Sequence, residues 1–179
     1  MIKGVIIMDA KERRSAILQL LRSRTQPVTG SELARRMGVS RQVIVQDIAL
    51  LRTGGAAVFA TPEGYVMPSV TPQSVRSVIA ACHTDAEQMR RELEIVVDRG
   101  GTVVDVSIEH PVYGEISVPL MLRSRMGVDA FMQSFEKGET APISGLTGGV
   151  HLHTLEAPGE DEMKAITDAL RREGLLISD

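Results

Sequence analysis

Histidines are the side chains of this sequence whose number and spacing could do chemistry. The chain has four of them, at positions 83, 110, 151 and 153. His151 and His153 stand two positions apart in the stretch GGVHLHTLEAP, among apolar and β-branched residues. Side chains two apart in a strand point to the same face of a sheet. The two imidazoles therefore lie together as packed core residues, as catalytic groups, or as two ligands of one metal ion.

A metal ion at this pair would need further ligands, which must be His, Asp or Glu because a single cysteine cannot build a thiolate site. His83 is one candidate, and the helix expected after it carries Glu87, Glu92 and Glu94. Zinc binds such groups at about 2.0–2.2 Å, most often with four ligands. A nitrogen and oxygen set without sulfur suits Zn, Ni, Fe, Mn or Co, and spacing does not choose among them.

No motif in the sequence places a catalytic group beside these histidines. A nucleophile elbow, a phosphate-binding loop and an HExxH helix are all absent from it. The one cysteine, Cys82, precedes His83, but neighbouring strand residues face opposite ways, so we expect Cys82 in the core. We therefore predict that the protein is not an enzyme.

Charge divides the chain into a basic and an acidic half. Residues 1–69 hold ten Lys and Arg against five Asp and Glu, and residues 70–179 hold ten against eighteen. Only the first half is expected to bind a polyanion. The sequence has no run of about 18 apolar residues and no signal peptide at its start, so we expect no membrane span. The single cysteine fits the reducing cytoplasm.

The half that holds the histidines is predicted to alternate strands and helices. Strands are expected over residues 77–82, 101–110, 112–122 and 149–157, and helices over residues 85–98, 124–139 and 160–174. This β-α-β-β-α-β order is that of the ferredoxin-like arrangement, extended by a helix and by LLISD (residues 175–179) as a last strand. The predicted fold class of the whole chain is α+β.

The basic half is predicted to be a winged helix-turn-helix domain. Helices with capping residues are expected over residues 9–24, 31–37 and 41–52, and hairpin arms over residues 58–60 and 65–67. In this fold the second helix of the motif lies in the major groove of DNA. With Ile44 and Ile48 turned inward, five residues near its start are left outside: Ser40, Arg41, Gln42, Val45 and Gln46.

Those five side chains suit the edges of bases. Arg donates two bonds to guanine, Gln pairs with adenine, and a Val methyl contacts thymine. Phosphate contacts are expected from arginines elsewhere in the domain: Arg13, Arg14, Arg22, Arg24, Arg35, Arg36 and Arg52. Glu63, in the expected wing tip, would be repelled by phosphate. The alternative, a winged domain that contacts protein, is disfavoured by the excess of positive charge.

Three stretches together resemble a known family. SRQVIVQDIALLR, EHPVYGEI and GGVHLHTLEAP look like the niacin-responsive repressors of bacterial NAD metabolism, the NiaR or YrxA type. That family joins a winged helix-turn-helix to a three-histidine domain that binds metal and effector and dimerises. The two domains are predicted over residues 1–69 and 73–179. PSVTP, with two prolines, is the expected linker between them.

The resemblance implies a divalent transition metal such as Ni or Zn, bound by His83, Glu92, His151 and His153. The spacing from His83 to Glu92 is one residue longer than in the family, so Glu87 remains the alternative carboxylate. His110 and Tyr113 are implied to line the pocket of the effector, nicotinic acid. A structural role at the end of its strand is the alternative for His110.

The function implied is that of a cytoplasmic homodimer that represses genes of NAD biosynthesis and niacin uptake. It would bind an operator in double-stranded DNA, with nicotinic acid as corepressor. Two other functions stay open at this point. One is a regulator that senses the metal ion without an organic effector, and the other is a metalloenzyme fused to a DNA-binding domain.

Overall fold

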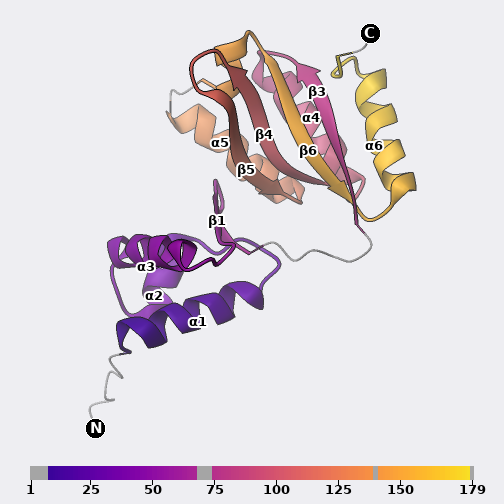
Figure 1. Ribbon diagram of the computed structural model, residues 1–179. Coiled ribbons are helices and arrows are strands. Elements are labelled where there is room, and N and C mark those ends of the chain that lie inside the picture. Colours follow the sequence, from indigo (N-terminus) through magenta and orange to yellow (C-terminus); the bar gives the residue numbers. More distant parts are fainter. Residues whose placement is uncertain (1–7, 68–73, 139–140, 178–179) are drawn as a thin grey trace. The chain divides into compact units, whose positions relative to one another are not determined.

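The computed structural model of the chain describes residues 8–67, 74–138 and 141–177. The chain divides into two compact units, residues 1–69 and residues 70–179, which are shown in Figure 1. The stretch PSVTP, expected to be a linker, lies outside the described residues. In the part of the chain that the structure describes, no helix is both long and apolar enough to cross a membrane.

The first unit contains the three predicted helices and the hairpin. Its elements are α1 (Ala10–Arg22), α2 (Gly30–Met37), α3 (Arg41–Thr53), β1 (Phe59–Thr61) and β2 (Gly64–Val66). Asp9 forms the expected capping box with Glu12, and Thr29 and Ser40 cap α2 and α3 with their side chains. Apolar faces of the three helices meet around Ile17, Leu33 and Ile44, so the helical spacing seen in the sequence is that of a buried core.

The hairpin is tied to the segment between α1 and α2. Its strands begin and end within one residue of the predicted arms, and Val28 pairs with Tyr65 through two backbone hydrogen bonds of 2.8 and 2.9 Å. Gly64 has φ +135°, and a Cβ there would lie 2.5 Å from the Val28 carbonyl oxygen. Only glycine fits so close an approach. The wing is therefore held against the helix-turn-helix by the backbone.

A buried carboxylate on α3 binds two arginines of α1. Arg13 donates to Asp47 at 2.6 Å from Nε and 3.3 Å from Nη2, and Arg14 reaches the same carboxylate at 3.5 Å. The pKa of Arg13 is raised by its hydrogen bond to Asp47. The side chain of Arg13 is 13% exposed and is paired with Asp47, so it connects the two helices. A phosphate contact by Arg13 stays a prediction.

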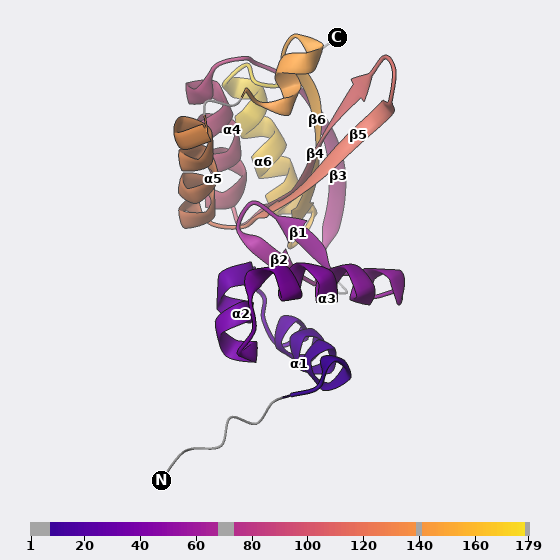
Figure 2. The ribbon, with the colours of Figure 1, turned by 90° about the vertical axis from the view of Figure 1, so that its left-hand side faces the viewer.

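The second unit is a four-stranded antiparallel sheet with helices. It consists of β3 (Val75–Cys82), α4 (Ala86–Asp98), β4 (Thr102–His110), β5 (Gly114–Leu122), α5 (Arg125–Gly138), a 3₁₀ turn (Ile143–Thr147), β6 (Val150–Ala157) and α6 (Glu160–Arg172). The helices lie on one face of the sheet (Figure 2). From β3 to α6 the strands and α-helices follow the predicted order, with a 3₁₀ turn added before β6, and the fold is α+β, as expected.

The strand order in the sheet is β3-β6-β4-β5, so the last strand stands between the first and the second. In the ferredoxin-like arrangement the third strand takes that place. The insertion of β6 brings its two histidines beside the end of β3, with Ala81 opposite His151 and Ile79 opposite His153. This strand order is what assembles the site described below.

Two details of the second unit differ from the sequence prediction. Cys82 is exposed rather than in the core, because Ile79 and Ala81 face the helices and Cys82 points to the other face. The described part of LLISD forms no strand. Leu176 makes one bridge to Ala81 at the edge of the sheet, where the chain follows α6.

Candidate metal centre

Three elements bring the candidate ligands together on the helix side of the sheet. His83 follows directly after β3, Glu92 lies on the buried face of α4, and His151 and His153 lie on β6. Along β6 these histidines alternate with the exposed Val150 and Leu152. All four candidate side chains are buried, and Glu92 is only 1% exposed. Burial of so many polar groups requires that they bind one another or a ligand.

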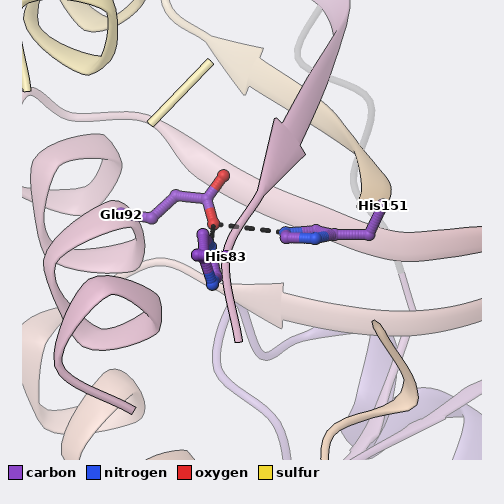
Figure 3. A group of neighbouring side chains, drawn as sticks. All are labelled: His83, Glu92 and His151. Carbon is purple, nitrogen blue, oxygen red and sulfur yellow. Dashed lines mark hydrogen bonds and ion pairs between the residues drawn. The ribbon is translucent and has the colours of Figure 1, made fainter. Parts of the chain in front are cut away.

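One oxygen of Glu92 is the centre of the cluster. Its Oε2 lies 2.5 Å from His83 Nε2, 3.3 Å from His151 Nε2 and 3.7 Å from His153 Nε2. Figure 3 shows His83 and His151 pointing at this carboxylate from two directions. The rings of His83 and His151 are edge to face, with centroids 4.7 Å apart. Three imidazoles thus aim the same type of nitrogen at one point.

The opposite nitrogens of the two β6 histidines are bound to backbone carbonyls. Nδ1 of His151 donates to the Gly149 oxygen at 2.7 Å, and Nδ1 of His153 donates to the Asp105 oxygen at 2.6 Å. A carbonyl only accepts, so Nδ1 carries the proton in each ring. In the neutral rings this leaves the Nε2 lone pairs free to bind a metal, which is the usual arrangement of metal-ligating histidines.

Charge interactions inside the cluster shift two protonation equilibria. Burial raises the pKa of Glu92, but the nearby imidazoles of His151, His153 and His83 outweigh it and hold this pKa well below 4.5. Burial lowers the pKa of His151, whereas Glu92 and the Gly149 carbonyl raise it, and the net pKa lies above 6.5. The centre therefore keeps an ionised Glu92 carboxylate beside a His151 imidazole that holds its proton more tightly than usual.

The residues present fit a divalent transition metal. Ligand atoms of His83, Glu92 and His151 all lie within 4.8 Å of one another. The second oxygen of Glu92, Oε1, is buried and has no hydrogen-bond partner among the described residues. A buried oxygen without a partner, next to imidazole nitrogens that converge on the same carboxylate, is expected where a cation binds. Nitrogen and oxygen donors without sulfur suit Zn, Ni, Co, Fe or Mn.

The other carboxylates considered from the sequence lie outside this cluster. Glu87 is exposed on the first turn of α4. Glu94 faces arginines, with Arg125 Nη1 at 3.2 Å and Arg90 Nη1 at 3.7 Å. Glu92 is therefore the carboxylate that the structure places with the histidines, in agreement with the set that the family resemblance implies.

His110 and Tyr113 lie at the tip of the β4–β5 hairpin. Nδ1 of His110 accepts the backbone N–H groups of Val112 and Tyr113 at 3.2 and 3.3 Å, and its ring lies 5.0 Å from the Tyr113 ring. Through these contacts His110 has a structural role, because it stabilises the turn between β4 and β5. Val112 and Tyr113 are 77% and 76% exposed. A role in effector binding remains a prediction for His110 and Tyr113.

The five residues predicted to read DNA bases all lie on the outside of the first unit. Ser40, Arg41, Gln42, Val45 and Gln46 are exposed at the start of α3. Arg41 lies over the start of α2, since a Cβ on Gly30 would be 3.3 Å from Arg41 Nε and 3.4 Å from Tyr65. Arg41 thus stands where α2, α3 and the wing meet, and its role in reading bases remains a prediction.

Sequence reasoning missed Gly149, Asp105 and Asp47. The Gly149 carbonyl accepts from His151 Nδ1 and from the His83 amide, and its φ of +97° requires glycine. The two consecutive glycines in GGVHLH could have indicated a residue with positive φ just before the histidines. Asp47 occupies a helical position between Ile44 and Leu51, and its place on the apolar face could have marked it as buried.

Comparison with known proteins gives matches over both units. A 3H domain family matches residues 76–179, and an HTH domain family matches residues 13–66. The chain is 44% identical over 169 residues to a probable transcription repressor, NiaR, of Thermotoga maritima, which covers 94% of this chain and 95% of the relative. It is 42% identical over 169 residues to the transcription repressor NadR of Bacillus subtilis, covering 93% and 94%.

Proposed function

Because the chain belongs to the family of transcription repressors that join an HTH domain to a 3H domain, we propose that it represses genes of NAD metabolism with nicotinic acid as corepressor. In this proposal a divalent metal ion occupies the buried cluster of the second unit. The protein acts as a homodimer on chromosomal DNA in the cytoplasm. The observation that carries the proposal is the convergence of three imidazole nitrogens on Glu92 in a chain of this family.

Operator binding is assigned to the first unit. Its residues carry a net positive charge, as required to bind phosphates. The start of α3 presents arginine, glutamine and valine side chains that match the donors, acceptors and methyl groups of the major groove. The wing, anchored at Val28, lies in a fixed place beside this helix within the unit. A two-fold dimer would place two such helices on a palindromic operator.

The effector is assigned to the acidic second unit. His83, Glu92, His151 and His153 would hold the metal ion through Nε2 and carboxylate oxygens. A bound ion would supply a positive centre that can receive a pyridine carboxylate. The carbonyls of Gly149 and Asp105 orient two of the imidazoles for this. Nicotinic acid then favours the dimer geometry that fits the operator, through its differential affinity for the two states.

Operator titration in the presence of metal tests this proposal. Full-length protein loaded with Zn²⁺ or Ni²⁺ should bind its operator more tightly when nicotinic acid is added. Nicotinamide, which lacks the carboxylate, serves as the matched control and should have less effect. Calorimetry should detect nicotinic acid binding to the metal-loaded protein.

Two outcomes would select the other functions. If metal alone switches operator affinity and nicotinic acid does not bind, the protein is a metal sensor without an organic effector. If nicotinic acid or a related amide is turned over by the loaded protein, the second unit is a metalloenzyme. The family names favour neither outcome, since both relatives are named as transcription repressors.

A further inference from the structure

Strand β4 is irregular where it passes the centre. Four steps along β4, from Val103 to Ser107, match only three along β6, from Leu155 to Leu152. One extra residue is therefore accommodated in β4, which is the pattern of a β-bulge. The pairing of β4 with β5 also shifts nearby, where two steps along β4 from Val103 to Asp105 match three along β5, so that the extra residue there lies in β5. Bulges interrupt the ladder and redirect backbone groups, and the one in β4 lies opposite His153.

Asp105 stands in this bulge and binds two consecutive residues of β6. Its carbonyl oxygen accepts His153 Nδ1–H at 2.6 Å, and its Oδ1 accepts the Thr154 amide at 3.0 Å. The carboxylate thus provides the Thr154 amide with an acceptor where the ladder is interrupted. The side chain of Asp105 holds the bulge to β6, and the same residue's carbonyl orients the imidazole.

His153 depends on another strand for its orientation, unlike His151. The acceptor of His151 Nδ1 is Gly149, two residues earlier in the same chain segment, whereas Asp105 lies 48 residues from His153. His153 Nε2 is also farthest from Glu92 Oε2, at 3.7 Å. The compact group of ligand atoms within 4.8 Å contains His83, Glu92 and His151. Entry of His153 as the fourth ligand therefore depends on β4.

We propose that Asp105 is a positioning residue for the metal centre: it holds the β4 bulge to β6 and thereby decides whether His153 completes a four-ligand site. The inference rests on the proposed metal centre. Without the contact between Oδ1 and Thr154, the bulge and its carbonyl move, the His153 ring loses its fixed tautomer, and three protein ligands remain.

Asp105→Asn and Asp105→Glu separate geometry from charge in the full-length protein. The asparagine keeps an oxygen at the same position for the Thr154 amide, and the glutamate keeps the charge but moves the oxygen by one methylene. Asp129→Ala, in an exposed aspartate of α5, is the control for loss of an acidic side chain. Co²⁺ is the probe, because its visible absorption is intense in a tetrahedral site and weak at higher coordination.

Asp105→Asn and Asp129→Ala should keep the wild-type Co²⁺ spectrum and affinity. Asp105→Glu should bind Co²⁺ about 10–100-fold more weakly, as is typical when a hydrogen-bond partner of a ligand is lost. Its spectrum should match that of His153→Ala. Wild-type behaviour of Asp105→Glu would overturn the proposal, and so would equal losses in the asparagine and glutamate variants, which would point to charge.

Nitrogen-15 NMR of the metal-free protein distinguishes failure of this inference from failure of the metal centre. Wild type and Asp105→Asn should show His153 protonated at Nδ1, and Asp105→Glu should show a mixture of tautomers. An unchanged His153 tautomer in Asp105→Glu would refute the positioning role. Absence of Co²⁺ binding in wild type together with the expected tautomer change would refute the metal centre and leave only the positioning of the ring.

Discussion

The two candidate functional regions of this molecule position their polar side chains in opposite ways. Around Glu92 the polar groups are buried, converge on one oxygen, and are held from behind by backbone carbonyls. At the start of α3 the polar groups are exposed and point outward from a helix whose buried side is fixed by the core. The proposed metal centre is largely built without an ion, whereas the proposed DNA-reading face, residues Ser40, Arg41, Gln42, Val45 and Gln46, is a set of exposed side chains at the start of one helix.

Because of this difference, distances between side chains indicate the ligand in the buried region but not in the exposed one. A buried cluster must satisfy its charges, so distances within it indicate its ligand class. Exposed side chains remain solvated without DNA, and the same arginine can contact a base or a phosphate. Mutations in the centre should therefore have large and local effects, and those on the reading face should have smaller ones that depend on DNA sequence and salt.

Removal of a histidine ligand should have the largest effect. His151→Ala removes a nitrogen that lies 3.3 Å from Glu92 Oε2. We expect loss of stoichiometric metal, a larger defect than the about 10–100-fold seen for outer hydrogen-bond partners. Metal analysis of the purified protein measures it. His110→Ala, at the exposed hairpin tip, is the matched control and should retain the metal. Equal metal content in both variants would contradict the assignment.

Breaking the contact between α1 and α3 tests whether the reading helix is held as firmly as the centre. Asp47→Ala leaves Arg13 without its buried carboxylate, and we expect a loss of about 2–3 kcal/mol in local stability. Hydrogen exchange of the α1 and α3 amides measures this loss. Metal affinity of the second unit should not change. Unaltered exchange in the first unit would show that Asp47 does not hold these helices together.

Arg41→Ala asks whether the reading face discriminates bases. If Arg41 reads a guanine, operator affinity should fall by about 1–3 kcal/mol and selectivity at one position should relax. If it binds phosphate between α2 and the wing, affinity should fall equally for all sequences, with a shallower salt dependence. Lys11→Ala, at an exposed position of α1 outside the expected phosphate contacts, is the control for loss of a positive charge. An unchanged affinity and footprint would exclude Arg41 from the interface.

The metal-free centre should make stability depend on pH in a defined direction. The raised pKa of His151 means that its contribution is complete below its ordinary value of 6.5 and is lost as pH rises through the raised pKa. The lowered pKa of Glu92 means that its contribution is lost only in acid, as pH falls through that pKa. Denaturation of metal-free protein should thus show stability falling as pH rises from 6.5 through the raised pKa of His151. Glu92→Gln should flatten this dependence, and a parallel curve for that variant would contradict the coupling.

Glu63→Gln at the wing should have the smallest effect. Burial raises the pKa of Glu63, and in the proposed complex its carboxylate faces phosphate. Removal of this charge should tighten operator binding by about 0.5 kcal/mol or less, as for other surface charges. The gain should disappear at high salt. No gain at low salt would place the wing away from the DNA backbone.

Local patterns predicted most of the elements. Caps at Asp9, Thr29 and Ser40 and the spacing of apolar residues are read within one helical turn, so the helices were placed correctly. The position of β6 between β3 and β4 depends on contacts between distant segments, which no local pattern contains. Cys82 was misplaced because strand alternation gives two faces but does not say which one the helices cover.

Only part of the candidate metal centre could be predicted from the sequence. The His-x-His spacing indicated a shared face, and Glu92 could have been preferred to Glu87 because it lies three residues after Met89 and four before Val96, on the buried face. The role of Asp105 depends on a bulge and on a contact across two strands. Such a contact has no signature in the sequence of either strand.

Anomalous diffraction from crystals of the metal-loaded, full-length protein tests the central claim most directly. At the absorption edge of the added Ni²⁺ or Zn²⁺, we predict one strong peak per chain, bonded to Nε2 of His83, His151 and His153 and to a carboxylate oxygen of Glu92. A peak elsewhere, or no peak at this cluster in protein supplied with metal, would contradict the account.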